Sequence, residues 1–165
     1  MRHDRGYSLI ELLISLGMIG VLSAIAVPLV LESTRRSDLF AASERVGAVV
    51  RQTRLKAISQ NRNYRVRFDC PATNQLRALI VTGNALIDDA ANRCTMTIAG
   101  DGEIVNLPTG VTVDAEDATE LRVTPRGAFT AVGDSIPLII TVAHGSSNRS
   151  VTVSATGQLT FSNVF

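Results

Sequence analysis

The hydrophobic pattern divides the chain into an uninterrupted apolar run, a stretch with helical period, and a series of short alternating segments. The apolar run extends from Tyr7 to Leu31, and Glu11 is its only charged residue. A membrane-spanning helix needs about 20 apolar residues, so the length of this run is sufficient. Arg2 and Arg5 precede the run, and basic residues favour the cytoplasmic side. The pattern therefore predicts one spanning helix with a cytoplasmic N-terminus.

Glu11 is an unusual residue for such a helix. An unpaired charge in hydrocarbon costs on the order of 3 kcal/mol. The position of Glu11 near the start of the run allows its side chain to reach the headgroup region. Alternatively, a cation neutralises the carboxylate, since a buried charge requires a partner. The two explanations are compatible with each other, and both stay open at this point.

A cleavable secretory signal is the alternative interpretation of the same segment. Ala24, Ile25 and Ala26 match a signal-peptidase site, and they follow a basic start and an apolar stretch. However, the apolar run continues beyond this site to Leu31, and Glu11 lies inside it. A spanning segment is therefore the preferred interpretation.

The stretch from Glu32 to about Asn61 has the period of an amphipathic helix. Pro28, with Gly17 and Gly20 upstream, is expected to bend the helix or to melt it locally. A continuous helix from the start of the apolar run to Asn61 would be about 80 Å long at about 1.5 Å per residue. The predicted contact with a globular head consists of seven residues that share one narrow sector of the helical wheel: Leu39, Ala42, Val46, Val49, Val50, Thr53 and Ala57.

Beyond Asn61 the apolar residues alternate with polar ones, which is the period of a β-strand. Turns that contain glycine, proline or asparagine separate the alternating segments. The sequence therefore predicts an α+β fold, in which a long N-terminal helix packs on a mostly antiparallel β-sheet head. The first half of this helix is expected to be transmembrane and the second half amphipathic. The predicted strands are Tyr64–Phe68, Leu76–Val81, Thr95–Ala99, Glu103–Leu107, Leu121–Thr124, Ala128–Ala131, Leu138–Val142, Ser150–Ser154 and Gln158–Phe161.

The N-terminal segment RGYSLIELLISLGMIGVLSAIAVP resembles the start of type IV pilins and pseudopilins. In that family a basic leader ends in glycine, an aromatic residue commonly follows, and a glutamate stands fifth in the mature chain. The resemblance implies that a prepilin peptidase cuts after Gly6 and that Tyr7 becomes the N-methylated mature N-terminus. It also implies that Glu11 pairs with the new amine of Tyr7, in the same subunit or in a neighbour, and so fixes filament register.

The body of the chain carries a second resemblance. The segments VVRQTRLKAISQNRNYRVRF, LRVTPRGAFTA and PLIITVAHGSSNRSVTVSATGQLTF are similar to the GspH/FimT class of minor pseudopilins. The resemblances imply a structural subunit of the bacterial inner membrane that serves in protein secretion. It would join other pilins in a type II secretion pseudopilus or a type IV pilus, near the tip, on an inner-membrane assembly platform. They predict a leader at 1–6, a transmembrane and filament-core helix at 7–31, an amphipathic helix at 32–61 and a periplasmic β-rich head at 62–165.

Composition narrows the candidate chemistry. The net charge is +1 and only 4% of the residues are aromatic, so bulk charge indicates no particular partner and the core must be aliphatic. Cys70 and Cys94 are too few for a four-cysteine zinc site, and no metal or other cofactor is predicted. In an oxidising compartment the two thiols would form a disulfide worth about 3 kcal/mol; otherwise they are buried free thiols. The periplasmic position of the head favours the disulfide.

Two further features are weighed as candidate sites. The sequence has no G-x-S-x-G, P-loop or H-E-x-x-H motif, and His144 lies in HGSSN, which is typical of a hairpin turn, so the chain is predicted not to be an enzyme. The run from Asp114 to Glu120 holds four carboxylates, and calcium prefers clustered oxygen ligands. The run does not match an EF-hand loop, so a solvated acidic loop is the preferred interpretation.

A basic run covers the end of the helical stretch and the first strand. Its members are Arg45, Arg51, Arg54, Lys56, Arg62, Arg65 and Arg67. The candidates for polyanion contact are Arg51, Arg54, Lys56 and Arg62, which makes a DNA-binding minor pilin for DNA uptake the alternative function. The helical wheel spreads the helical members over both edges of the apolar sector, as expected for a solvated exterior or for contact with acidic subunits. Some FimT-like relatives linked to DNA uptake carry arginines near a C-terminal glycine, and Gly157–Thr160 has none, which disfavours the alternative.

Overall fold

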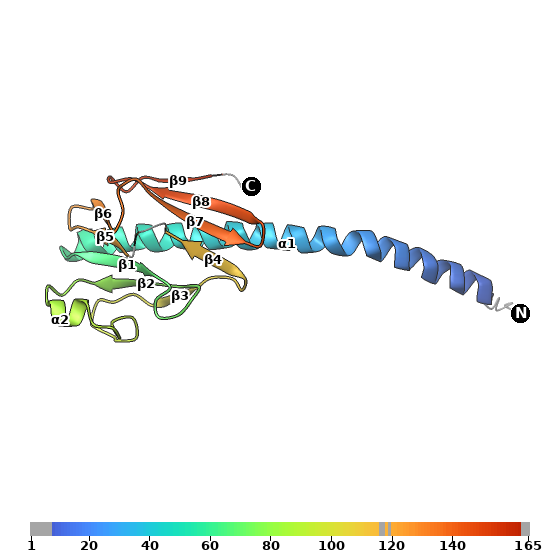
Figure 1. Cartoon of the computed structure of the whole chain (residues 1–165), viewed down its shortest axis with the longest axis horizontal. Helices are drawn as coiled ribbons and strands as arrows, with labels where there is room; N and C mark the ends of the chain where they lie inside the picture. Colours follow the sequence, from blue (N-terminus) through green and yellow to red (C-terminus); the bar gives the residue numbers. More distant parts are fainter. Residues whose placement is uncertain (1–7, 116–117, 119, 163–165) are drawn as a thin grey trace, which may run out of the picture. The chain divides into compact units, whose positions relative to one another are not determined.

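The computed structural model describes residues 8–115, 118 and 120–162. They form two compact units that divide between Arg35 and Arg36. Helix α1 (Leu9–Gln60) contributes its first part to one unit and its second part to the other (Figure 1). Each unit is described by itself below.

The first unit consists of the apolar part of α1. Large apolar side chains from Leu9 to Leu31 are all more than half exposed. In the part of the chain that the structure describes, α1 is the one helix long and apolar enough to cross a membrane. The helix continues through Pro28, so the local melting expected there does not occur. Proline removes one hydrogen bond of the ladder, and the neighbouring turns keep theirs.

The second unit contains two antiparallel sheets and the short helix α2 (Ala85–Asp88). The strands of the first sheet, in spatial order, are β3 (Ile104–Asn106), β2 (Gln75–Ile80), β1 (Tyr64–Phe68), β5 (Glu120–Val123) and β6 (Phe129–Val132). Those of the second sheet are β4 (Val111–Asp114), β7 (Leu138–His144), β8 (Ser147–Val153) and β9 (Leu159–Phe161). The predicted α+β class, with a long helix on antiparallel strands, is confirmed.

The core of the second unit lies between α1 and the inner faces of both sheets. All seven residues of the predicted helical sector are buried, which confirms the contact face of α1. Ser43 and Gly47 are buried on the same face, although their small side chains carry no hydrophobic signal. A Cβ atom on Gly47 would lie 2.8 Å from the Phe161 ring, so the close approach of β9 to α1 requires glycine there.

Eight of the predicted strands are present with small shifts of their ends, and the strand predicted at Thr95–Ala99 is wrong. Backbone groups of this segment, which a neighbouring strand would need for its hydrogen bonds, are instead hydrogen-bonded to side chains. The carbonyls of Cys94 and Met96 accept from Arg77, and the Ile98 amide donates to Asp101. Strand β4 and helix α2, each four residues long, are the elements that the sequence pattern does not single out.

Candidate functional site

Glu11 lies exposed in the first turn of α1. The Ser15 hydroxyl donates to the backbone carbonyl of Glu11 at 2.8 Å, which leaves the carboxylate outside that contact. Gly6 and Tyr7, the predicted processing residues, lie outside the described residues. The ion pair between Glu11 and the Tyr7 amine therefore stays a prediction.

The apolar part of α1 is a second candidate site. Its exposed side chains include Leu9, Met18 and Leu29 at 78%, 64% and 67% exposure. Soluble monomeric proteins rarely expose contiguous apolar surface of this extent, and such surface indicates contact with a membrane or with other proteins. The apolar surface of the first unit is thus suited to burial in a membrane or against other proteins.

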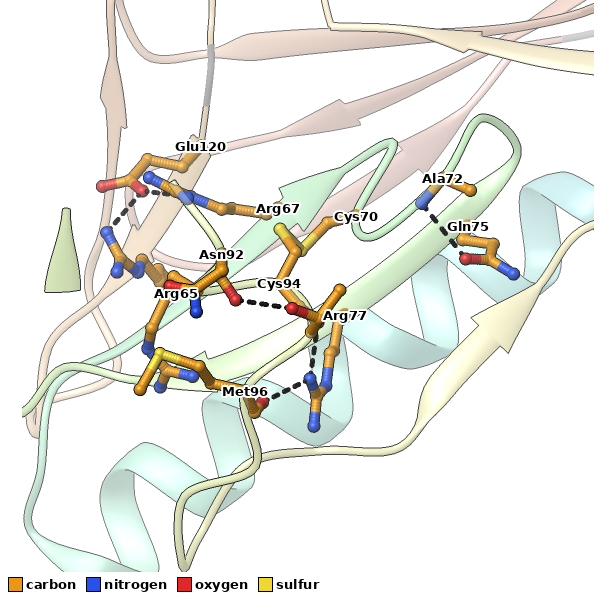
Figure 2. The surroundings of a disulfide bond; sticks show 12 residues. Arg65, Arg67, Cys70, Ala72, Gln75, Arg77, Asn92, Cys94, Met96 and Glu120 are labelled. Atoms are coloured by element: carbon orange, nitrogen blue, oxygen red, sulfur yellow. Dashed lines mark hydrogen bonds and ion pairs between the residues drawn. A yellow bond between two sulfur atoms is a disulfide. The ribbon is translucent and has the colours of Figure 1, made fainter. Parts of the chain in front are cut away.

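Cys70 and Cys94 form a disulfide in the structure, with Cα atoms 5.2 Å apart and a sequence separation of 24 (Figure 2). Cys70 follows the end of β1, and Cys94 belongs to the segment between α2 and β3. Arg77 on β2 holds the same segment, since it donates to the carbonyls of Cys94, Met96 and Gly102 at 2.6, 2.7 and 3.1 Å. The disulfide and Arg77 together fix the segment against the first sheet.

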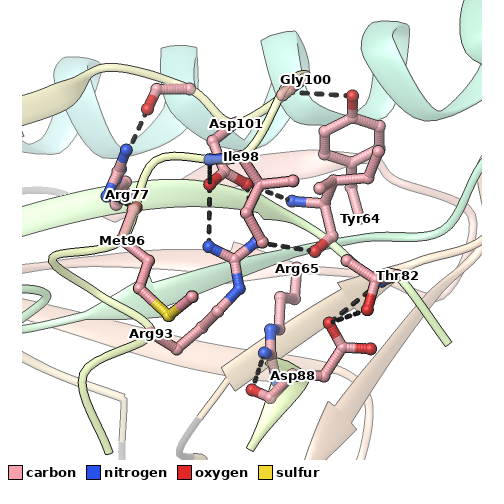
Figure 3. Close-up of polar contacts among 12 residues, drawn as sticks. Tyr64, Arg65, Arg77, Thr82, Asp88, Arg93, Met96, Ile98, Gly100 and Asp101 are labelled. Atoms are coloured by element: carbon pink, nitrogen blue, oxygen red, sulfur yellow. Dashed lines mark hydrogen bonds and ion pairs between the residues drawn. The ribbon is translucent and has the colours of Figure 1, made fainter. Parts of the chain in front are cut away.

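A buried ion pair closes the other end of this segment (Figure 3). Arg93 donates to both carboxylate oxygens of Asp101 at 2.8 Å, and both side chains are at most 1% exposed. The amides of Ile80 and Ile98 also donate to Asp101. Burial on its own would raise the pKa of Asp101, but the hydrogen bonds from Arg93 and the two amides outweigh it and hold that pKa below its usual value.

Asp88 stabilises the turn that precedes α2. Its carboxylate accepts from the amides of Thr82 and Gly83 and from the Thr82 hydroxyl, all at 2.9–3.0 Å. Burial would raise the pKa of Asp88, but these hydrogen bonds and the charge of Arg65 lower it. The carbonyl of Asp88 in turn accepts from Arg65 (Figure 3).

Glu120 corrects the interpretation of the acidic run as a solvated loop. It lies in β5, its side chain is 3% exposed, and it accepts hydrogen bonds from Arg65, Arg67 and Arg122 at 2.9, 3.1 and 2.6 Å. Burial would raise the pKa of Glu120, but the hydrogen bond from Arg122, the charge of Arg65 and the bond from Arg67 lower it. Within the run, Asp114 is exposed in β4, and Glu116 and Asp117 lie outside the described residues.

The structure disperses the residues predicted to contact polyanions. Arg54 donates to the Gly127 carbonyl at 3.0 Å, and Arg51 lies over the Phe161 ring at 5.7 Å from its centroid. Lys56 lines a groove of about 440 Å³ between α1 and the β2–β3 edge, and Arg62 is exposed in the turn after α1. These four side chains therefore do not form one patch. Of the remaining basic run, Arg45 donates to the Asn106 carbonyl, and Arg65 and Arg67 contact Glu120.

Arg149 is a buried residue that the sequence interpretation missed. Its guanidinium lies 4.3 Å from the Phe40 ring centroid and 5.1 Å from that of Phe161. It donates to the Ser43 hydroxyl at 2.6 Å and to the Ser162 carbonyl at 3.0 Å. The signal that could have found it is the alternation of β8, where Arg149 shares a face with two buried valines. Arg149 thereby fastens the last strand to α1.

Metal-ligating side chains and His144 are the remaining candidates for chemistry. No group of three or more His, Cys, Asp and Glu side chains is placed there to hold a metal ion. His144 ends β7 beside the two-residue turn to β8, and its Nδ1 atom lies 3.9 Å from Asp38 Oδ2. His144 therefore lies at the end of the β7–β8 hairpin, as the sequence predicts.

Comparison with known proteins identifies both parts of this architecture. Residues 1–27 match the family model described as the prokaryotic N-terminal methylation motif. No curated protein matches the chain. The type IV minor pilin FimU of Pseudomonas aeruginosa has a similar structure, with a TM-score of 0.57 and 16% identity over 79% of this chain and 92% of that one.

The minor pseudopilin EpsH from the type 2 secretion system of Vibrio cholerae is also similar, with a TM-score of 0.50 and 18% identity over 75% of this chain and 95% of that one. At such identities the likeness shows the fold. This chain therefore combines the methylation motif of prokaryotic prepilins with the fold of minor pilins and pseudopilins. Both family resemblances of the sequence are confirmed at this level.

Proposed function

We propose that this chain is a minor pilin-like subunit that enters the inner membrane as a precursor and then joins a periplasmic filament. Cleavage by a prepilin peptidase after Gly6 would release Tyr7 as the N-methylated mature N-terminus. The observation that carries the proposal is the methylation motif at residues 1–27, which continues into an apolar helix whose large side chains, as far as the structure describes them, are more than half exposed from Leu9 to Leu31. The membrane covers that helix first, and the filament core covers it after assembly.

Glu11 gives the assembly step its register in this proposal. Hydrocarbon disfavours its charge, and the amine freed at Tyr7 is a cation that does not exist before cleavage. In a helical array the carboxylate of one subunit meets the amine of its neighbour. The filament is a type II secretion pseudopilus or a type IV pilus, and the subunit sits near the tip with a structural role in protein secretion. Its partners are other pilins and an inner-membrane assembly platform.

The intact mass of the chain extracted from the membrane tests the processing step. The expected mass is that of residues 7–165 plus one methyl group. A mass that corresponds to cleavage after Ala26 would instead show a secretory signal and overturn the proposal.

The variant Glu11→Ala tests the assembly step. We expect the variant to insert and to be cleaved like the wild type, because Ala removes the carboxylate and leaves the segment apolar and helix-forming. Its incorporation into sheared filaments should fall at least tenfold, since the register ion pair is lost. Glu32→Ala, which removes a carboxylate from a later turn of α1, is the matched control. Normal assembly of Glu11→Ala would contradict the register role.

DNA uptake remains the second candidate function, and the exposed side chains of Arg51 and Arg62 are the observation in its favour. A protein that neutralises several phosphates binds DNA more weakly as salt rises. A gel-shift titration of the full chain in detergent, at low and at high salt, tests this function. Absence of binding at low salt would remove it.

A further inference from the structure

The outer face of the first sheet, turned away from α1, carries four arginines and one carboxylate on three adjacent strands. Arg67 on β1 lies directly opposite Arg77 on β2 and opposite Glu120 on β5. Arg65 on β1 lies opposite Arg122 on β5. Side chains directly opposite each other in antiparallel strands are about 5 Å apart at Cβ, so these five form one cluster.

The buried part of this cluster holds more positive than negative charge. Arg65 and Arg77 are 1% and 5% exposed. Arg77 is compensated by three backbone carbonyls, whereas Arg65 contacts Glu120 and the carbonyl of Asp88. The exposed carboxylate of Asp89 lies at the rim, 3.9 Å from Arg65. The cluster as a whole therefore carries a net positive charge, and its solvent-exposed side is positively charged.

Arg67 and Arg122 are the two members that reach solvent, with 28% and 50% side-chain exposure. Glu120 holds each of them by the Nε atom, through Oε2 for Arg67 at 3.1 Å and through Oε1 for Arg122 at 2.6 Å. Among the described residues, the Nη groups of both arginines have no hydrogen-bond partner. One buried carboxylate thus orients two guanidinium groups with free donors on the outside. We call this pair the Arg67–Arg122 fork.

We propose that the Arg67–Arg122 fork is a docking site for a carboxylate on the head of a neighbouring subunit. The inference rests on the proposed function, because it assigns the partner to the filament. Guanidinium groups bind carboxylates through paired, charge-assisted hydrogen bonds. Glu120 fixes the two groups before the partner arrives, so that little side-chain entropy is lost on binding.

A protein carboxylate fits the fork better than a nucleic acid does. Duplex DNA carries about one charge per 1.7 Å of helix axis, and strong binding uses roughly 6–10 phosphate contacts. The fork offers two guanidinium groups, with Glu120 between them and Asp89 at the rim, and these carboxylates oppose a continuous line of phosphates. A single acidic side chain matches its size and charge.

Binding of a labelled hexaglutamate peptide to the full-length chain in detergent tests the site. Fluorescence anisotropy compares the wild type with Arg122→Gln and with the control Arg126→Gln, an exposed arginine in the β5–β6 turn. We expect Arg122→Gln to weaken binding about tenfold, because a charge-assisted pair is lost. Arg126→Gln should change binding less than twofold. Arg122→Gln also removes a hydrogen-bond donor from the buried carboxylate of Glu120 and should lower the unfolding temperature, whereas Arg126→Gln should not. Binding is therefore compared at a temperature where both variants are fully folded.

Equal binding by the wild type and Arg122→Gln would overturn the proposal, as would an equal loss in both variants. A labelled 12-base-pair duplex is the second probe. Duplex binding by the wild type that disappears in Arg122→Gln would assign the fork to nucleic acid and would overturn the protein assignment.

Filament incorporation in cells separates this inference from the proposed function. Arg122→Glu should be cleaved and inserted normally but should be recovered in sheared filaments at least fivefold less than the wild type. If Arg122→Glu assembles fully while Glu11→Ala does not, the fork proposal alone is wrong. If the mature chain does not begin at Tyr7, the proposed function is wrong, and peptide binding by the fork still reports on the site.

Discussion

At the scale of single residues, carboxylates organise the outer layer of the head. Both Asp101 and Glu120 are almost fully buried: Asp101 accepts hydrogen bonds from Arg93 and two backbone amides, and Glu120 accepts from three arginines. Breaking such a buried pair by removing one partner costs about 3–5 kcal/mol, because the other charge is left without compensation. The two residues therefore act as fixed points, to which loops and strands are fastened by hydrogen bonds.

The lowered pKa values of Asp101 and Glu120 predict acid sensitivity. In the folded head these groups stay ionised at pH values where the unfolded chain, with carboxyl pKa values of about 4, is already protonated. The unfolded state then binds more protons, so the free energy of unfolding falls as pH decreases. Their contribution should be complete above about pH 5 and should be lost progressively below about pH 4.

Denaturant unfolding of the full chain in detergent, followed by circular dichroism between pH 3 and pH 7, measures this dependence. Asp101→Asn should lower stability at pH 7 and should flatten the acid limb. Glu103→Gln, which changes an exposed carboxylate of the same edge, is the control and should leave the curve unchanged. An acid limb of unchanged slope in Asp101→Asn would contradict the assignment.

The buried arginines also show where sequence reasoning fails. In β1, arginine alternates with tyrosine, valine and phenylalanine, and this pattern is typical of a strand with one solvated face. Arg65 is nevertheless 1% exposed, because the segment after β2 covers that face, and its hydrogen-bond partners are the Asp88 carbonyl of that segment and Glu120 of β5. The covering segment has no periodicity of its own, and so the sequence alone contains no signal for the burial.

At the scale of elements, sequence periodicity predicts the regular helix and strands. It does not predict segments that are ordered by side-chain hydrogen bonds and ion pairs. The contact face of α1 follows from its 3.6-residue period, and most strands follow from alternation and turn residues. The segment between α2 and β3 is ordered instead by Arg77, Arg93, Asp101 and the disulfide. Interactions of this kind depend on tertiary placement, which explains the wrong strand at Thr95–Ala99.

The disulfide between Cys70 and Cys94 predicts an effect on the stability of the head that is greatest in this segment. Replacing both cysteines by serine removes a cross-link over 24 residues and should lower the free energy of unfolding by about 3 kcal/mol. Amide hydrogen exchange should increase most at residues 89–103, because the cross-link holds this segment directly, and core amides should lose only the protection that corresponds to the lower global stability. Ser146→Ala, in the exposed β7–β8 turn, is the matched control. Uniform loss of protection throughout the head would contradict a local role.

At the scale of the whole molecule, the two units have separate requirements for stability. The core of the second unit begins at Leu39 and uses no residue of the first. The first unit has no buried apolar residue among those described and depends on its surroundings. The sequence pattern changes from a uniformly apolar to an amphipathic helix between Leu31 and Glu32, and the two units divide between Arg35 and Arg36. The pattern could not predict which polar faces of the head are covered.

This division predicts that the head folds without the apolar helix. A fragment that begins at Arg36 should be soluble and should unfold in one cooperative transition, within about 4 °C of the full chain in detergent. Differential scanning calorimetry and circular dichroism provide the measurement. The same fragment with Leu39→Ala, which opens a cavity at the start of the core, should unfold at lower temperature. A fragment without a cooperative transition would show that the first unit is needed for folding.

The segment clamped by Arg77 and Arg93 gives the head two interiors of different chemistry. One, between α1 and the sheets, is aliphatic and depends on the exclusion of water. The other, between the first sheet and the covering segment, depends on ionised groups and carbonyls. Acid below about pH 4 weakens the second without acting directly on the first. A drop in pH is therefore expected to detach the covering segment between α2 and β3 first. The helix and strands beneath it should unfold only under harsher conditions.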